Sequence, residues 1–263
     1  MIKHWLFTGD THGCTATRIA NIKRNRYDLR PEDTAIVFLG DVGLNYYLNK
    51  KDKRAKELVN SYGYLVYCVR GNHEARPSAA TGMQLYNDPE VNGFVYREPE
   101  YPNIRYLIDT FDYTIGGQRT LIIGGAYSVD KYYRLAQGWN WFEDEQLTPE
   151  EKSVIADKLT YNRYDIILAH TCPYSWRPTD LFLAGLDQSK VDSTMELWLE
   201  ELKDKFKDSI YLFGHYHDDR LVREKVEMYY TKYDTLENIL TRWDSGKQPD
   251  YYYPKDPNYY MGR

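Results

Sequence analysis

The chain has 263 residues, 42% of them hydrophobic, and a formal net charge of −5, which allows a buried core in a domain of moderate size. No apolar run is long enough for a membrane span, and the run after Lys3 and His4 is too short for a signal peptide. We therefore expect a cytoplasmic protein without a membrane partner. The net negative charge argues against a protein whose main role is to bind duplex nucleic acid. Three widely spaced cysteines argue against a disulfide framework.

Short apolar runs alternate with helical patterns in the N-terminal third of the chain. The runs 2–8, 35–39 and 64–69 predict buried strands, and the polar segments 15–27 and 47–62 predict the helices between them. This alternation is typical of βαβ units, in which parallel strands present their carboxyl ends at one edge of a sheet. Each predicted strand is followed by glycine and a residue that can bind a metal, so metal ligands should gather at that edge.

The middle of the chain has a different pattern. Residues 75–103 contain four prolines, which predicts a long irregular loop that could face a substrate. Gly116-Gly117-Gln118 predicts a hairpin between alternating strands. The segment 127–147 is too polar for a core element and should form an ordered excursion, whereas a Thr-Pro-Glu-Glu start predicts a helix over 148–161.

The C-terminal part continues the series of strands. The runs 165–169 and 209–213 predict two more buried strands, and 220–233 should form a closing hairpin or edge strand. The Tyr- and Pro-rich segment 242–263 is expected to be a tail that is partly unstructured or wraps around the body. Because the chain has no internal repeat and no low-complexity linker, we expect a single domain over residues 1–263.

Eight residues of metal-binding type lie just past the ends of the predicted strands. They are Asp10, His12, Asp41, Asn72, His73, His170, His215 and His217. Five of the six histidines belong to this set, and only His4 lies elsewhere. One such histidine is usually structural, but five at the ends of strands make coincidence a poor explanation.

These residue types suit a pair of metal ions. Two aspartates, an amide oxygen and four neutral imidazoles fit borderline divalent ions such as Mn, Fe or Zn, whereas all-oxygen sites fit Mg or Ca. Two ions about 4 Å apart can share a carboxylate and a bridging hydroxide, which attacks phosphorus in line. The departing oxygen needs an acid, and His73 is the natural candidate, because its neighbour Asn72 supplies a ligand and the His73 side chain then points away from that metal.

Five short motifs, which contain these residues, resemble those of the calcineurin-like metallophosphoesterase superfamily and follow the same order. They are Gly-Asp-Thr-His-Gly at 9–13, Gly-Asp at 40–41, Gly-Asn-His-Glu at 71–74, His170, and Gly-His-Tyr-His at 214–217. The resemblance is to bacterial and phage members related to Ser/Thr protein phosphatases and diadenosine tetraphosphatases. It implies an α/β fold, namely a four-layer α/β/β/α sandwich with two mixed sheets.

The resemblance also implies a role for each residue. One ion would be held by Asp10, His12, Asp41 and His217. The other would be held by Asp41, Asn72, His170 and His215. Asp41 would then bridge the two ions, and His73 would be the catalytic acid.

The second block departs from the phosphoprotein phosphatases. Their Gly-Asp-x-Val-Asp-Arg-Gly block supplies an aspartate that supports the catalytic histidine and an arginine that clamps phosphate. Residues 40–45 read Gly-Asp-Val-Gly-Leu-Asn instead. Glu74 could support the histidine, and Arg76, Arg134 or Arg177 could bind phosphate, although each of these arginines is more often a surface charge.

The leading interpretation is a two-metal phosphoesterase whose substrate is a phosphoprotein or a small phosphate mono- or diester. A nucleotide or dinucleotide is the alternative substrate, since rings in loops 75–103 and 127–142 could stack on a base. A non-catalytic protein-binding module on the same fold would predict lost ligands, yet no expected ligand is missing. A zinc hydrolase of carbon esters or amides is disfavoured by the Asn ligand. The oligomeric state stays open.

Overall fold

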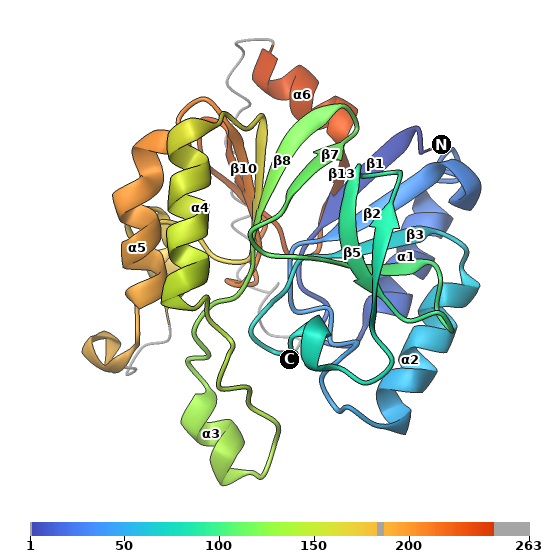
Figure 1. The fold of residues 1–263 in the computed structure, drawn as a ribbon, viewed down its shortest axis with the longest axis horizontal. Coiled ribbons are helices and arrows are strands. Elements are labelled where there is room, and N and C mark those ends of the chain that lie inside the picture. Colours follow the sequence, from blue (N-terminus) through green and yellow to red (C-terminus); the bar gives the residue numbers. More distant parts are fainter. Residues whose placement is uncertain (1, 183–186, 245–263) are drawn as a thin grey trace.

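The computed structural model describes residues 2–182 and 187–244, and two sheets carry helices on their outer faces (Figure 1). The first sheet has seven strands in the order β13-β1-β2-β3-β6-β5-β4. Its strands are β1 (His4–Thr8), β2 (Thr34–Phe38), β3 (Leu65–Cys68), β4 (Gln84–Asp88), β5 (Gly93–Arg97), β6 (Ile104–Leu107) and β13 (Tyr233–Thr235). The four strands β1, β2, β3 and β6 are parallel, and antiparallel pairing adds β13 at one edge and the β4–β5 hairpin at the other.

The second sheet has six strands in the order β11-β12-β10-β9-β8-β7. Its strands are β7 (Asp112–Ile115), β8 (Gln118–Ile123), β9 (Ile166–Ala169), β10 (Ile210–Phe213), β11 (Arg220–Arg223) and β12 (Val226–Met228). The inner strands β8, β9, β10 and β12 are parallel, and β7 and β11 pair antiparallel at the edges. The predicted hairpin at Gly116-Gly117-Gln118 joins β7 to β8.

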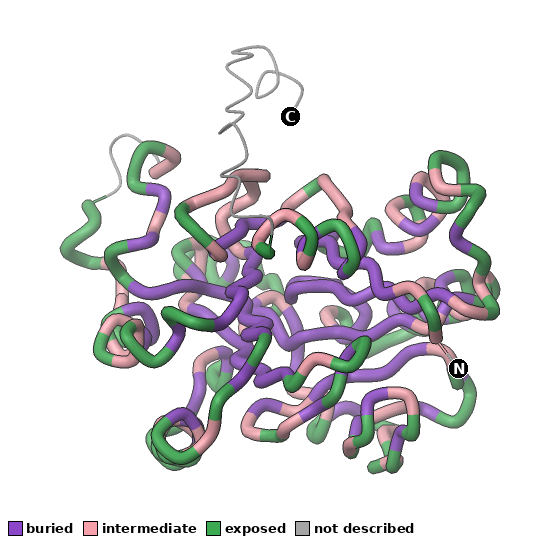
Figure 2. The backbone as a smooth tube through the Cα atoms, turned by 90° about the horizontal axis from the view of Figure 1, so that it is seen from above, coloured by how far each residue is buried: buried purple, intermediate pink, exposed green. Residues whose placement is uncertain are grey.

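Six α-helices are described, of which two cover the outer face of each sheet, one lies in the segment after β8, and one packs into the core between the sheets. They are α1 (Thr15–Asn25), α2 (Lys50–Ser61), α3 (Lys131–Ala136), α4 (Pro149–Tyr161), α5 (Thr194–Leu202) and α6 (Leu236–Asp244). One apolar core lies between α1, α2 and the first sheet, a second between α4, α5 and the second sheet, and a third between the two sheets. This confirms the predicted α/β/β/α sandwich, and the buried strands run through its middle (Figure 2). Among the described residues, no helix combines the length and apolar character needed to cross a membrane.

The prediction of an irregular loop over 75–103 is wrong, because β4 and β5 form a hairpin that widens the first sheet. Pro89 lies in the connection between the two strands, and the other three prolines lie outside them. The prolines therefore lie outside the two short strands, where they do not interrupt the pairing. The hairpin places these residues in the sheet rather than in a loop.

The C-terminal elements close the sandwich in a way that the sequence did not indicate. The expected hairpin forms as β11 and β12, but β13 crosses to the first sheet and pairs with β1. The helix α6 was not predicted, and its Leu236 and Ile239 pack into the core between the sheets. Most of the expected tail, residues 245–263, lies outside the described residues.

Two glycines at strand ends let the two sheets approach closely where the strands finish. A Cβ on Gly40, after β2, would lie 2.0 Å from Nδ1 of His170, which follows β9. A Cβ on Gly214, after β10, would lie 2.3 Å from Oδ1 of Asp10, which follows β1. Each glycine of one sheet therefore contacts a side chain of the other, and this brings the carboxyl ends of both sheets into one volume.

Gly40→Ala should destabilise the fold more than Gly117→Ala. Both glycines have positive φ angles, +100° and +83°, so alanine is strained at either position by about 1–2 kcal/mol. Only at Gly40 does the new methyl group meet a side chain, that of His170, and overpacking should cost a further ~1–3 kcal/mol. Urea unfolding followed by circular dichroism measures both losses, and equal losses would contradict this close contact between the sheets.

Candidate metal centre

The structure gathers the predicted ligands at the shared edge of the two sheets. Asp10 and His12 follow β1, Asp41 follows β2, Asn72 and His73 follow β3, His170 follows β9, and His215 and His217 follow β10. Three overlapping groups of side chains have possible ligand atoms within 4.8 Å of one another. They are Asp10 with His12 and His217, His12 with Asp41 and His73, and Asp10 with Asp41 and His170.

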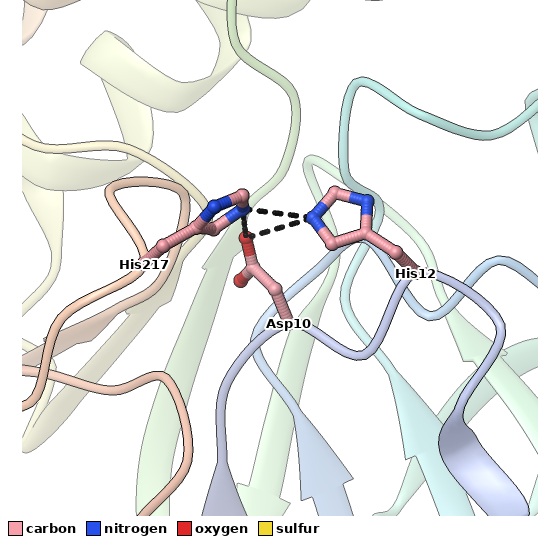
Figure 3. A group of neighbouring side chains, drawn as sticks. All are labelled: Asp10, His12 and His217. Atoms are coloured by element: carbon pink, nitrogen blue, oxygen red, sulfur yellow. Dashed lines mark hydrogen bonds and ion pairs between the residues drawn. The ribbon is translucent and has the colours of Figure 1, made fainter. Parts of the chain in front are cut away.

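The first group combines one buried carboxylate with two imidazoles (Figure 3). Nε2 of His12 lies 2.8 Å from Nε2 of His217, and these atoms lie 3.9 and 3.4 Å from Oδ2 of Asp10. Burial would raise the pKa of Asp10, but the hydrogen bond with His217 and the charge of His170 hold it below its usual value. The imidazoles are partly exposed, so a substrate can reach this side of the centre.

Asp41 lies between two groups of ligands. Its Oδ2 is 3.8 Å from Nε2 of His12, and its Oδ1 is 3.5 Å from Nε2 of His170. Oδ1 also accepts a hydrogen bond of 2.8 Å from the backbone N–H of His73. Burial would raise the pKa of Asp41, but the charge and hydrogen bond of His170 hold it well below the usual value. The carboxylate is therefore ionised, with one oxygen directed to each group.

The surroundings of His170 fit a bound cation. Its Nδ1 lies 2.8 Å from the carbonyl oxygen of Leu39, which can only accept, so Nδ1 carries the proton. In a neutral ring, Nε2 is then an acceptor, yet it faces Oδ1 of Asn72 at 2.8 Å and Oδ1 of Asp41 at 3.5 Å. Burial would lower the pKa of His170, but Asp41 and Asp10 raise it to about 9, so a proton on Nε2 balances these acceptors where a metal ion would otherwise do so.

The backbone of the centre is strained. Four non-glycine ligands have φ angles in the left-handed region, namely His12 at 45°, Asp41 at 48°, His215 at 71° and His217 at 55°. Each such residue costs about 1–3 kcal/mol, and such strain clusters at functional sites. These turns direct several side chains toward a common point from strands that lie in two sheets.

The last block contributes two differently placed rings. The His215 ring packs on that of His170 with 5.1 Å between centroids, and its backbone N–H donates to both oxygens of Asp10 at 3.1 Å. Burial and the charge of His170 lower the pKa of His215 to about 3, so its ring is neutral. The His217 ring stacks on Tyr230, at 4.9 Å between centroids, a contact that no motif indicated.

A hydrogen-bonded chain behind Asn72 fixes its orientation. Nδ2 of Asn72 donates to Oγ of Ser128 at 2.8 Å, so Oδ1 is the atom that faces His170. Ser128 donates in turn to Oε2 of Glu145 at 2.5 Å, and Arg134 donates to Ser128 at 3.1 Å. These residues come from the predicted excursion 127–147, where their spacing carries no recognisable signal.

His73 lies beside His12 and Asp41. One of its ring nitrogens lies within 4.8 Å of ligand atoms of His12 and Asp41, and its ring meets that of His12 edge-on at 4.9 Å between centroids. Asn72 faces His170 instead. The two neighbouring side chains therefore diverge.

The carboxylate next to His73 is not the expected one. Oδ1 of Asp130 lies 3.6 Å from Nε2 of His73. Glu74 instead accepts a hydrogen bond of 3.0 Å from the backbone N–H of Gly71, and burial together with the charge of Asp41 raises its pKa to about 7. Asp130 thus lies where Glu74 was expected, and it comes from the polar excursion.

Two of the three candidate arginines have structural contacts rather than an open position. Arg76 forms an ion pair of 2.6 Å with Glu151 and donates to a backbone carbonyl oxygen at 2.8 Å. Arg134 is buried, so it is not a surface charge, and it supports Ser128 and the carbonyl oxygen of Asn140. Both guanidinium groups therefore bind other groups of the protein through ion pairs or hydrogen bonds.

The third arginine borders an open cavity. A cavity of about 390 Å³ adjoins the ligands His215 and His217, and Arg177 is part of its wall. The guanidinium of Arg177 lies 3.4 Å from the centre of the Tyr174 ring. Of the three candidate arginines, Arg177 is the one that the structure places beside the ligands in a cavity.

Comparisons with known proteins give a match to a family model. The calcineurin-like phosphoesterase family model matches residues 4–219. The solved structure of TT1561 from Thermus thermophilus is 13% identical, with a TM-score of 0.46 over 89% of this chain and 98% of that chain. Phosphopantetheinyl hydrolase from Mycobacterium tuberculosis is 14% identical, with a TM-score of 0.41 over 97% of each chain. No curated protein matches this chain.

The family model covers every ligand-bearing block, from the end of β1 to the turn after β10. The structure supplies the two sheets and the clustered aspartates and histidines that the metal site needs. The chain therefore belongs to the calcineurin-like phosphoesterase family, a family of metal-dependent hydrolases that act on phosphoester bonds.

Proposed function

We propose that this protein is a phosphoesterase that depends on two divalent metal ions. The observation that supports two ions is the position of Asp41, whose two oxygens face Nε2 atoms of His12 and His170 in different ligand groups. A carboxylate that bridges two ions has this arrangement. A single-ion site would leave one of these groups without a role.

The proposed ligand sets are those that the family resemblance implies, and the three observed groups of side chains contain all of these residues except Asn72 and His215. Asp10, His12, Asp41 and His217 would hold one ion, and Asp41, Asn72, His170 and His215 the other. The mixture of nitrogen and oxygen ligands favours Mn, Fe or Zn. When bound, the ions activate water as a nucleophile and neutralise charge on the phosphate oxygens. The chain of Ser128 and Glu145 holds the amide oxygen of Asn72 toward its ion.

His73 is the proposed general acid. It lies beside Asp41 and His12, within reach of a phosphoester at the centre, and an imidazole nitrogen would give its proton to the departing oxygen. The carboxylate of Asp130, 3.6 Å from Nε2, would stabilise the protonated ring. Asp130 would thus take the part that an aspartate of the second block has in phosphoprotein phosphatases.

A small phosphate mono- or diester is the proposed substrate rather than a phosphoprotein. The cavity beside His215 and His217 has the volume of a small-molecule site, about 390 Å³. The acidic net charge supports the expectation that duplex nucleic acid is not a substrate.

Three free cysteines support the proposed cytoplasmic location. The apolar core that the two sheets share supports the proposal of a single domain.

Asp41→Asn should remove both ions and lower the hydrolysis of p-nitrophenyl phosphate by at least about 100-fold. The amide lacks the negative charge and has only one oxygen, so it cannot serve two ions. Mass spectrometry of bound metal and steady-state rates with Mn measure both effects. Asp157→Asn, an exposed change on α4, should keep metal and activity. Near-normal turnover of Asp41→Asn, or loss of a single ion, would refute the bridging role.

His73→Ala should retain both ions and slow hydrolysis by about 10²- to 10⁴-fold for poor leaving groups. The loss should be much smaller for p-nitrophenyl phosphate, because nitrophenolate departs without an acid. Rates for an alkyl and a nitrophenyl ester, with metal content measured on the same sample, test this. His4→Ala, at the start of β1, is the control. Loss of metal from His73→Ala would make His73 a ligand instead.

A further inference from the structure

The cavity beside the metal centre has largely apolar and aromatic walls. They come from three segments: the excursion after β8, the described residues between β9 and α5, and the turn after β10. The apolar and aromatic lining residues are Tyr127, Val129, Leu181, Phe182, Val191 and Tyr216. A ligand here would bury an apolar surface within contact distance of the metal ligands.

Two rings in this wall are nearly parallel. The planes of Phe182 and Tyr216 differ by 22°, with 6.3 Å between centroids. Tyr216 is held in place by a hydrogen bond of 3.1 Å between its hydroxyl and Oγ1 of Thr171, and by an edge contact with Phe213. Walls of this kind favour a flat ring, because aromatic faces attract each other in offset stacks.

Polar groups are also fixed in the wall. Nη1 of Arg177 donates to Oγ of Ser193 at 3.2 Å, and Oε1 of the buried Glu196 accepts from Thr171 at 2.8 Å. Gln188 adds an amide to the lining. The guanidinium of Arg177 and the carboxylate of Glu196 have hydrogen-bonding capacity beyond the bonds named here, which a flat heterocycle with donors and acceptors on its edge can use and a hydrocarbon ligand cannot.

We propose that this cavity binds the nucleoside part of a phosphoester, so that the enzyme acts on nucleotides or nucleoside phosphodiesters. This inference rests on the proposed function. His215 and His217, two of the proposed metal ligands, also line the cavity. A phosphate at the centre would therefore be joined to a base in the cavity through one sugar. The volume of about 390 Å³ is in the range of sites for small ligands.

Matched substrate pairs test the proposal with the Mn-loaded enzyme. Adenosine 5′-monophosphate and ribose 5-phosphate release phosphate from the same alcohol and differ only in the base. Thymidine 5′-(p-nitrophenyl phosphate) and methyl p-nitrophenyl phosphate form a pair of diesters with the same leaving group, and they differ in the whole nucleoside. We expect kcat/KM to be at least about 10-fold higher for the nucleoside member of a pair, the effect of stacking one base. Equal values within both pairs would overturn the inference.

Binding of adenosine gives a readout that does not depend on hydrolysis. Calorimetry on the protein should detect adenosine but not ribose, and absence of adenosine binding would overturn the inference. Hydrolysis of p-nitrophenyl phosphate reports separately on the proposed function. Adenosine binding without hydrolysis of any ester would keep the nucleoside site and refute the phosphoesterase.

Two variants connect the preference to this cavity. Phe182→Ala removes one aromatic wall, and Val191→Trp fills the space. Each should bring the ratio of kcat/KM within a pair close to one and weaken adenosine binding at least about 10-fold. Phe94→Ala changes an exposed phenylalanine on β5 and should keep the ratio. A preference retained by both cavity variants would place the base elsewhere and refute the assignment.

Discussion

The carboxylate of Asp41 is the point on which the two halves of the molecule depend. It is 1% exposed and ionised, and it lies between His12 from the first sheet and His170 from the second. A buried charge is unfavourable unless opposite charge or hydrogen bonds compensate it. The compensation here comes from both sheets, so the sandwich and the centre form together. The positive φ of Asp41 shows the same dependence, since its strain persists only where the surroundings hold it.

The parallel strands, and the clustering of the polar residues that follow them, could be predicted from the sequence because each signal is local. A short apolar run marks a strand, and a glycine followed by a polar residue marks its end. Parallel strands then bring such ends to one edge whatever the length of chain between them. The same local signal gave no indication of α6, whose Leu236 and Ile239 are buried only because the gap between the sheets accepts them.

The residues that the sequence did not reveal act through contacts between distant segments. Ser128 and Glu145 orient Asn72, and Asp130 approaches His73, yet all three come from a polar excursion without a motif. Glu74, adjacent to the histidine in sequence, was the local choice, and its carboxylate binds the backbone of its own loop instead. Neighbours in sequence are poor guides to the groups that surround a site, because those groups are selected by tertiary packing.

The three arginines illustrate the same limit. Arg76, Arg134 and Arg177 have the same charge and all lie in segments without a motif, so the sequence did not rank them. The fold separates them by their partners. Arg76 forms an ion pair with Glu151, and Arg134 is buried. Of the three, only Arg177 borders the cavity next to His215 and His217.

The pairing of β13 with β1 has a consequence for biosynthesis. The first strand to leave the ribosome has its outer edge covered by the last one, with Leu6 opposite Thr235. Until the final strand emerges, that edge is open to pairing with other chains, as unpaired strand edges are. The first sheet is therefore complete only once residues 233–235 have been synthesised, more than two hundred residues after β1. The contact between His12 and His217 likewise joins an early and a late segment, so this group of side chains cannot assemble before His217 has left the ribosome.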